Sequence, residues 1–526
     1  MVFALPNAAL HLTLFIVLLS VAVKAYVWPS PQLDALESLR FELDRHSIAS
    51  FIQPCTFFLF SVDGPSGRSN VADWIRTAYH DMATYNSTDG TGGMDASIRF
   101  AEEQARAENV GDGFNNTFRL LTQITTRYVS IADALALGAI IAIENCGGPE
   151  IAFRGGRLDA GEPNAPGVPQ PEQDLQSHID SFARQGFNQT EMIGLVACGH
   201  TFGGVQHDPF PDIVPALNDP NNTESVTHFD STFINFDNNV AKEYISGTTS
   251  NPLVVGFNQT TNSDQRIFSS DGNATMRSFA QSSQLFASTC AELFARMLDT
   301  VPRGVELTEV ITPLPVKPDF LALTLDNDTL QFSGQVRFWN MTEDPNRTAV
   351  LLWEDHSGAT HNATMSVGDT STGGGTTSLW YAFDDPGVRL DPVAGITRMS
   401  FSIDGELYDQ DGVGFAVQDA IAFSKTSCLT NPNSSPIAGR FDIAVRNGAN
   451  VTRVFLEEEV KDSVGRITVV ETDFPRPASP SAATTAYSLW SLNMTQTSST
   501  RTIGAEVDGI KMSTGRLAVL FDLPDC

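Results

Sequence analysis

The chain has 526 residues and a formal net charge of −30 at pH 7, because 62 Asp and Glu residues outnumber 32 Lys and Arg residues. This length exceeds that of a typical single domain, so more than one domain is expected. The acidic balance disfavours partners that need a basic surface, which are nucleic acids and anionic membranes. It is compatible with neutral or cationic small substrates and with a soluble extracellular protein.

The first 25 residues are typical of a secretory signal peptide. An apolar run, LHLTLFIVLLSVAVKA, ends in small residues, with Val23 and Ala25 at the −3 and −1 positions before Tyr26. An uncleaved anchor is the alternative, but the run is short for a membrane span. No later stretch is long and apolar enough to cross a membrane. We therefore expect a secreted protein.

Glycosylation sequons and cysteines agree with secretion. The six cysteines are even in number, so most are expected to form disulfides in an oxidising compartment, although 15 pairings are possible. Asn-x-Ser/Thr sequons, which predict a glycoprotein, occur in both halves of the chain. Their asparagines are Asn86, Asn115, Asn188, Asn221, Asn258, Asn273, Asn327, Asn340, Asn346, Asn362, Asn433, Asn450 and Asn493.

Apolar periodicity predicts a mainly helical region from about residue 30 to residue 300. Residues 71–82 repeat apolar side chains at helical spacing, and residues 130–146 are apolar almost all round, which predicts a buried helix. Ser130 and Asp133 have the spacing of a capping box at its start. Residues 276–300 read as one long helix.

The pattern changes after Val301. A proline-rich stretch, residues 301–318, is expected to be a linker. Short alternating runs separated by turn residues follow, which predicts a β-sandwich-like region over residues 319–526, with a possible division near residue 435. The runs cover residues 329–339, 348–355, 378–384, 396–404, 440–447, 453–460, 465–474 and 516–523.

Two polar residues of the stretch RTAYH carry a chemical hypothesis. Arg76 and His80 lie four residues apart, so they share one face of a helix. A cation beside a neutral imidazole is suited to proton transfer while negative charge develops on a neighbouring oxygen, as cleavage of hydrogen peroxide requires. The alternative is that a surface arginine and a histidine are neighbours by chance.

Further motifs favour the chemical interpretation. They are GGMDASIRF at 92–100, ACGHTFGG at 197–204, HFDSTFINFD at 228–237 and SSD at 269–271. With these motifs and RTAYH, the chain resembles the plant-type haem peroxidase superfamily, most closely its secreted fungal class II branch. The resemblance covers about residues 45–300, and we expect a haem peroxidase domain over residues 26–300.

The resemblance implies roles for residues around a haem b group. His80 would be the distal acid–base group, Arg76 would stabilise the leaving oxygen, and Asn109 would accept a hydrogen bond from the distal histidine. Tyr79 stands where an aromatic residue lies over the haem, and Glu103 matches a supporting residue.

On the proximal side, His200 matches the ligand of the haem iron. Asp271 matches the carboxylate that makes this imidazole more electron-rich. Phe229 stands where the intracellular branch of the superfamily has a radical-forming tryptophan, which favours the secreted branch.

Two calcium sites are implied in the same way, since calcium prefers oxygen ligands at close spacing. The distal set is Asp81, Gly93, Asp95 and Ser97. The proximal set is Thr201, Asp230, Thr232, Asn235 and Asp237.

Some positions depart from the best-known fungal enzymes. Leu195 replaces an exposed tryptophan used for long-range oxidation. The positions of a manganese site hold Ser69, Asp73 and Gln206, which provide one acid of three. The resemblance therefore implies a low-potential peroxidase that uses hydrogen peroxide to oxidise small phenolic or aromatic donors at the haem edge.

The cysteines and the C-terminal half are less informative. Cys55 with Cys146 resembles one bridge of the superfamily, Cys198 is either bridged or a small buried residue, and Cys428 with Cys526 could close the C-terminal region. The tryptophans of the β-rich region fill sandwich cores or form a platform for cell-wall polymer. Alternatives to an active peroxidase are a wall- or glycan-binding protein with an inactive peroxidase scaffold, and peroxidase chemistry turned to cross-linking of wall components.

Overall fold

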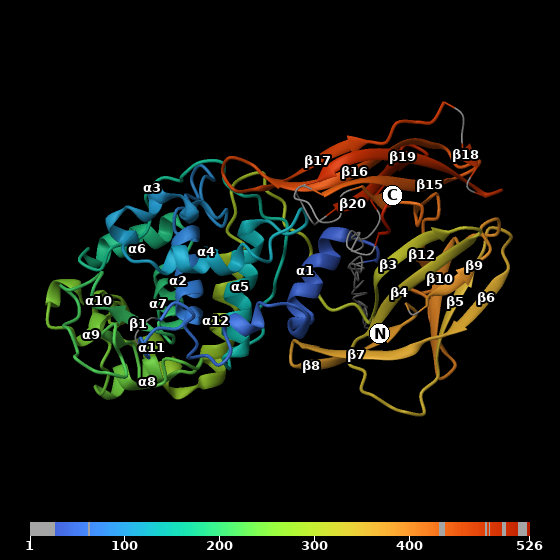
Figure 1. Ribbon diagram of the computed structural model, residues 1–526. Coiled ribbons are helices and arrows are strands. Elements are labelled where there is room, and N and C mark those ends of the chain that lie inside the picture. Colours follow the sequence, from blue (N-terminus) through green and yellow to red (C-terminus); the bar gives the residue numbers. More distant parts are fainter. Residues whose placement is uncertain are drawn as a thin grey trace, which may run out of the picture.

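The computed structural model describes residues 27–61, 64–384, 386–430, 437–478, 481–482, 484–496, 501–513 and 523–526. A helical half and a β-rich half lie side by side, as Figure 1 shows, which confirms the predicted fold class. The expected signal peptide, the sequon Asn433, the division near residue 435 and nearly all of the run 516–523 lie outside the described residues.

The helical half carries one small hairpin in addition to its helices. None of the described helices has both the length and the apolar character that crossing a bilayer would require. The hairpin consists of β1 (Gly204–Gln206) and β2 (Val226–His228). The helices are α1 (Pro31–Phe41), α2 (Asn70–Met82), α3 (Ala101–Gln104), α4 (Gly113–Leu121), α5 (Ile131–Asn145), α6 (Leu175–Arg184), α7 (Gln189–Gly199), α8 (Asn239–Ser246), α9 (Pro252–Val255), α10 (Ser263–Phe268), α11 (Ala274–Gln281) and α12 (Ser283–Leu298).

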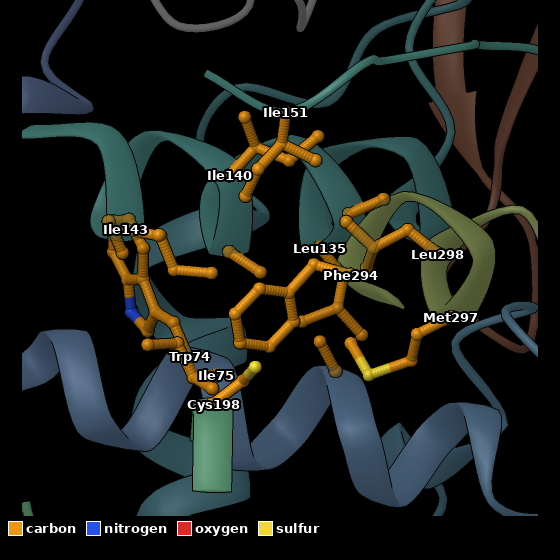
Figure 2. Close-up of a cluster of buried hydrophobic side chains, with 14 of the residues drawn as sticks. Trp74, Ile75, Leu135, Ile140, Ile143, Ile151, Cys198, Phe294, Met297 and Leu298 are labelled. Atoms are coloured by element: carbon orange, nitrogen blue, oxygen red, sulfur yellow. The ribbon is translucent and has the colours of Figure 1, made fainter. Parts of the chain in front are cut away.

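Helix α5 is the centre of this half. It begins at a capped end, because the Ser130 hydroxyl accepts a hydrogen bond from the Asp133 amide at 2.9 Å. The helix is apolar all round and is buried over residues 131–143. Figure 2 shows side chains of α2, α5 and α12 meeting in one cluster. The labelled members are Trp74, Ile75, Leu135, Ile140, Ile143, Ile151, Cys198, Phe294, Met297 and Leu298.

The long helix expected over residues 276–300 is divided in two. Helix α11 ends at Gln281, and α12 starts after Ser282, whose backbone is extended (φ −141°). The Ser282 hydroxyl accepts a hydrogen bond from the Leu285 amide at 3.1 Å, so Ser282 caps the second helix. Serine competes with the helical backbone for hydrogen bonds, which apolar periodicity does not register.

The strands of the β-rich half form three sheets. The longest has the order β18-β19-β15-β13-β3-β4-β8-β7, with β9 and β14 attached, while β11-β10-β5-β6 with β12 and β17-β16-β20-β21 are shorter. The strands are β3 (Val316–Asp326), β4 (Thr329–Phe338), β5 (Ala349–Glu354), β6 (Thr360–Thr364), β7 (Ser366–Gly373), β8 (Thr376–Ala382), β9 (Val388–Leu390), β10 (Arg398–Ile403), β11 (Glu406–Tyr408), β12 (Phe415–Ala416), β13 (Ile421–Ser424), β14 (Cys428–Leu429), β15 (Ile437–Arg446), β16 (Val451–Lys461), β17 (Ile467–Asp473), β18 (Ser481–Ala482), β19 (Tyr487–Gln496), β20 (Arg501–Val507) and β21 (Ile510–Ser513).

Each shorter sheet covers a different part of the long sheet, so the β-rich half has two hydrophobic cores. Trp353 lies in the first core and Trp490 in the second, with exposed fractions of 8% and 6%. Trp380 is also buried, and Trp339 packs edge-on against Phe41 of α1 at 5.3 Å between ring centroids. Trp353 and Trp490 therefore fill sandwich cores, as expected, whereas Trp380 packs against Arg45 and Trp339 against α1.

The first described residues, which include Trp28 and α1, contact the β-rich half. Trp28 packs against Phe415 of the first sandwich core, and α1 lies between the helical half and the sheets in Figure 1. Glu37 in α1 forms a buried ion pair with Lys317 of β3 (2.7 Å) and another with Arg337 of β4. Glu42, directly after α1, pairs with Arg337 at 2.5 Å.

Another ion pair joins the halves further along the interface. Arg127, in the loop before α5, forms two hydrogen bonds with the Glu457 carboxylate of β16, at 2.5 and 2.9 Å. Hydrogen bonds from Arg127, Ser513 and Thr502 hold the pKa of Glu457 at about 2, although burial acts in the opposite direction. The two halves therefore form one body with charged groups buried between them.

Three disulfides close loops of the chain. Cys55 pairs with Cys146, and Cys428 pairs with Cys526, as the sequence suggested. Cys198 is bridged to Cys290, which ties α7 to α12 inside the helical core. The prediction of disulfide bonds is confirmed.

We expect the Arg337→Leu substitution to lower the free energy of unfolding by about 3–5 kcal/mol, because it leaves the two buried carboxylates of Glu37 and Glu42 with a single cation, Lys317, between them. Arg398→Leu is the matched control. Arg398 also lies on a sandwich strand, but its pair with Glu354 is half exposed, and such pairs contribute about 0–1 kcal/mol. Chemical denaturation of both variants measures the difference, and equal destabilisation would contradict this role of the buried cluster.

Candidate active site

A cavity lies between α2 and α7 in the helical half. Arg76, Tyr79 and His80 of α2 line it on one side, and His200 and Phe229 line it on the other. Helix α2 is fixed at its start by Ser69, whose hydroxyl accepts a hydrogen bond from the Ala72 amide at 3.2 Å. His80 and His200 are far apart in sequence, but both line this cavity.

His80 is held in one orientation. Its Nδ1 lies 2.7 Å from Oδ1 of Asn109, and Nδ2 of Asn109 donates to the backbone carbonyl of Glu103 at 2.8 Å. An amide oxygen can only accept, so Nδ1 of His80 carries the proton and Nε2 keeps its lone pair. Burial, aided by the charge of Arg76, lowers the pKa of His80 to about 3. His80 is therefore a neutral base.

Arg76 provides a fixed positive charge one turn from His80. Its guanidinium donates to the Val110 carbonyl at 3.1 Å and lies 4.4 Å from the centre of the Phe114 ring. Desolvation in the cavity lowers the pKa of Arg76 to about 10, which still leaves the side chain charged at neutral pH. The predicted pairing of Arg76 with His80 on one helix face is present.

Tyr79 lies beside this pair. Its ring stacks on Phe182 of α6 at 6.0 Å, and its hydroxyl is buried. Burial raises the pKa of Tyr79, so the phenol stays protonated. Tyr79 thus contributes an aromatic wall to the cavity rather than a charge.

On the opposite wall, His200 follows directly after α7. Its Nδ1 lies 2.8 Å from Oδ2 of Asp264, a carboxylate of α10 that is 1% exposed. The same oxygen accepts a hydrogen bond from Nδ2 of Asn251 at 2.8 Å. The Phe229 ring is stacked on the imidazole at 4.1 Å. These contacts hold Nδ1 on the carboxylate and leave Nε2 as the free ring nitrogen.

The predicted partner of His200, Asp271, is wrong. Its carboxylate accepts hydrogen bonds from the amides of Ala274 and Thr275, and so caps α11. The chain contains two Ser-Asp pairs seven residues apart, at 263–264 and 270–271. The first pair forms the start of α10, whereas the second precedes α11 and is followed by Gly-Asn, which is typical of a turn. That difference in context was the signal for Asp264.

The distal calcium residues lie together, but protein donors already occupy their oxygens. Oxygens of the Asp81 carboxylate accept from the amides of Asp95, Ala96 and Ile98, and the Gly93 carbonyl accepts from the Asp95 amide. The side-chain amide of Asn164 lies between Asp95 and Ser97. A donor at the centre of an oxygen cluster does not fit a bound cation, so the distal residues do not fit calcium.

The proximal set is different. Asp230 Oδ1 accepts from the Thr232 amide at 2.9 Å, but Oδ2 is buried without a hydrogen-bond partner. Burial, with the nearby charges of Asp237 and Glu243, raises the pKa of Asp230 to about 7. An orphaned buried carboxylate oxygen is the kind of group that a bound cation satisfies.

The other proximal residues surround Asp230 unevenly. The Thr201 hydroxyl donates to the Asp237 carbonyl at 2.8 Å, whereas Asn235 is exposed and its amide donates to the Thr232 carbonyl. In the part of the chain that the structure describes, no three His, Cys, Asp or Glu side chains converge as a metal cluster. A cation here would depend on hydroxyl and carbonyl oxygens besides Asp230.

The mouth of the cavity contains a salt-bridge network that the sequence did not reveal. Arg68 contacts carboxylates of Asp73 (2.9 Å), Asp112 (2.8 Å) and Glu224 (3.2 Å). Gln206 donates to Glu224 at 2.5 Å. Asp73, the single acid of the expected manganese positions, is therefore already paired with a cation.

Comparison with known proteins identifies this helical half. Residues 62–284 match the family described as peroxidase. A WSC domain-containing protein of Arthroderma benhamiae is 41% identical over 317 residues, which are 59% of this chain and 43% of that protein.

Two relatives with peroxidase names cover less of the chain. The peroxisomal L-ascorbate peroxidase 5 of Arabidopsis thaliana is 30% identical over 186 residues, which are 35% of this chain and 61% of that protein. The mitochondrial cytochrome c peroxidase of Yarrowia lipolytica is 33% identical over 135 residues, which are 24% of this chain and 39% of that protein. The chain thus spans about two fifths to three fifths of the length of these relatives.

The predicted secreted fungal branch stays a prediction, because these relatives bear other names. The superfamily itself is supported both by the matched residues and by the cavity with a histidine on each wall. Residues 62–284 therefore form a peroxidase domain of the plant-type haem peroxidase superfamily.

Proposed function

We propose that this protein is a secreted haem peroxidase that reduces hydrogen peroxide to water while oxidising small phenolic or aromatic donors, one electron at a time. The observation that carries the proposal is the pairing of two differently held histidines on opposite walls of one cavity. His80 is a neutral base with its Nδ1 on an amide, and His200 has its Nδ1 on a carboxylate.

The residues present fit a haem. A carboxylate on one imidazole nitrogen increases the electron density of the ring, which suits the other nitrogen, Nε2 of His200, to bind iron. The cavity that contains this histidine also has aromatic and aliphatic walls, including Phe202, Phe229 and Leu253. Bound haem would supply the iron that takes up peroxide and the electrons of the donors.

The distal residues can move the required protons. Nε2 of His80 can accept a proton from one oxygen of hydrogen peroxide and return it to the other oxygen. The oxygen that receives the proton leaves as water when the O–O bond breaks. Arg76 stabilises the negative charge that develops on the leaving oxygen. Two electrons from two donor molecules and two further protons complete the reduction to a second water.

The mouth of the cavity favours neutral donors. Its polar residues include Asp73, Asp112 and Glu108, and the nearby cation Arg68 is held by carboxylates. Apolar residues such as Pro169 and Phe210 lie among them. This combination suits small uncharged aromatics better than anions, and it leaves no pair of free carboxylates for manganese.

Secretion and glycosylation are part of the proposal. The sequon asparagines within the described residues are all exposed or half-buried, as attachment of a glycan requires. Three disulfides are typical of an oxidising compartment. A single cation, calcium by its oxygen ligands, would bind at the proximal set around Asp230.

The binding-protein alternative is compatible with the WSC domain-containing relative. The tryptophans proposed as a platform do not support it, because Trp353 and Trp490 are buried in sandwich cores, Trp380 is buried against Arg45 and Trp339 packs against α1. A contact of the β-rich half with cell-wall polymer, and the use of the peroxidase reaction for cross-linking, stay predictions.

The proton-transfer role is tested by stopped-flow absorption after one equivalent of hydrogen peroxide is mixed with the holoprotein. We expect His80→Ala to slow the first spectral change by about 10²–10⁴-fold, the usual contribution of a general acid–base. Asn109→Ala should slow it about 10–100-fold, as loss of an orienting partner does. In the wild type, the rate should stay constant from neutral pH until it declines near pH 3, where His80 becomes protonated.

Retained haem absorbance in both variants is the control for folding. A wild-type rate that does not depend on His80 would contradict the assignment, and so would an acid limb near pH 6.5, the ordinary pKa of histidine.

The correction of the proximal carboxylate is tested by the reduction potential of the iron. We expect Asp264→Asn to raise the potential, because the His200 ring then has a neutral partner and donates less electron density. Asp271→Asn is the matched control, since it removes a charge seven residues away and affects only the cap of α11, at about 1 kcal/mol. Spectroelectrochemical titration would contradict the structure if Asp271→Asn produced the larger shift.

The proximal cation is tested by thermal unfolding with calcium and with a chelator. Calcium at ~100 times its Kd should stabilise the wild type by about 2.7 kcal/mol. Asp230→Asn should abolish this shift, because it removes the orphaned carboxylate, whereas Asp411→Asn on an exposed turn of the β-rich half should retain it. A wild type whose unfolding temperature ignores calcium would exclude the site.

A further inference from the structure

The side-chain amide of Asn164 lies at the centre of the oxygen cluster where a distal cation was expected. Its Nδ2 is 2.9 and 3.0 Å from the two carboxylate oxygens of Asp95, 2.9 Å from the Ser97 hydroxyl and 3.3 Å from the Thr84 hydroxyl. Four oxygens thus surround one nitrogen that has two hydrogens to donate.

The distances fit hydrogen bonds and not metal coordination. Calcium binds oxygen at about 2.3–2.6 Å, and the oxygens around Nδ2 lie farther away than that. The two oxygens of Asp81, the other carboxylate of the cluster, are turned to the amides of Asp95, Ala96 and Ile98. These protein donors therefore hold the loop of residues 93–98.

The backbone of Asn164 continues this network towards the distal histidine. Its amide donates to Oε1 of Glu103 at 2.5 Å, and Glu103 is 0% exposed. The backbone carbonyl of Glu103 accepts from Nδ2 of Asn109, whose Oδ1 lies on Nδ1 of His80. Asn164 thus connects the loop around Asp95 to the group that orients His80.

We propose that Asn164 is a positioning residue of the distal wall and that its amide replaces a distal calcium ion. The side chain fills the cluster around Asp95, and the backbone amide holds Glu103, so that Asn109 keeps His80 in its reactive tautomer. The positioning role rests on the proposed function, whereas the replacement of calcium does not.

The replacement is tested by the calcium content of purified holoprotein after equilibration with calcium and gel filtration. The Asp230→Asn background removes the proximal site. In this background we expect no bound calcium with Asn164 present and one calcium per chain with Asn164→Asp, because aspartate exchanges the central donor for a third carboxylate. Asn362→Asp, on the exposed strand β6, adds the same charge elsewhere and should bind none.

One calcium per chain in the Asp230→Asn protein, lost when Asn164→Ala is added, would overturn the proposal, since Asn164 would then hold a cation through its oxygen. A calcium-free Asn164→Asp protein would also contradict it.

The positioning role is tested by the reaction with one equivalent of hydrogen peroxide. Asn164→Ala should slow it about 10–100-fold and alter its pH dependence, because the partner of His80 is no longer fixed. In the Asp230→Asn background, Asn164→Asp should be slow in chelator and recover in calcium, while the protein that retains Asn164 should not respond to calcium at this step. A rate and pH profile equal to the wild type in Asn164→Ala would exclude the role. If the wild type itself does not react, the proposed function fails, and the calcium measurement remains decisive for the replacement.

Discussion

Burial of a neutral imidazole beside a cation is the condition on which the candidate active site depends. A charged His80 would lose its hydration and face Arg76, so the ring stays neutral down to about pH 3. Asn109 then decides which nitrogen holds the proton. This arrangement requires rigid surroundings, which α5 and the Cys198–Cys290 bridge provide inside the helical core.

The opposite wall also holds a histidine through a hydrogen-bond partner, but the partner differs. The partner of His200 is a buried carboxylate, which is itself held by Asn251, so the His200 imidazole is electron-rich. The amide partner of His80 only orients its ring. In the proposed function, this difference in partner would make His80 a base and His200 a ligand. The β-rich half lies outside this chemistry, but the charges buried between Glu37, Lys317 and Arg337 fasten it to the same body.

Sequence reasoning succeeded where local pattern decides the structure. The buried helix α5, the Arg76–His80 pair and the alternating strands were predicted, because helical and strand periodicities are local. It failed where partners come from distant segments. Asp264 lies 64 residues from His200, and Asn164 lies 69 residues from Asp95, so local sequence patterns do not predict either contact. The choice of Asp271 shows that a short motif without its helical context misleads.

The absorption spectrum of the protein purified from culture medium and supplied with haem tests the central claim most directly. The account predicts one haem per chain and a Soret band that His200→Ala abolishes or strongly shifts. His178→Ala should leave the band unchanged, although His178 of α6 lines the same cavity, because its Nδ1 lies on the carbonyl of Asp174 in its own helix cap. Absence of a Soret band, or a band that does not respond to His200→Ala, would contradict the account.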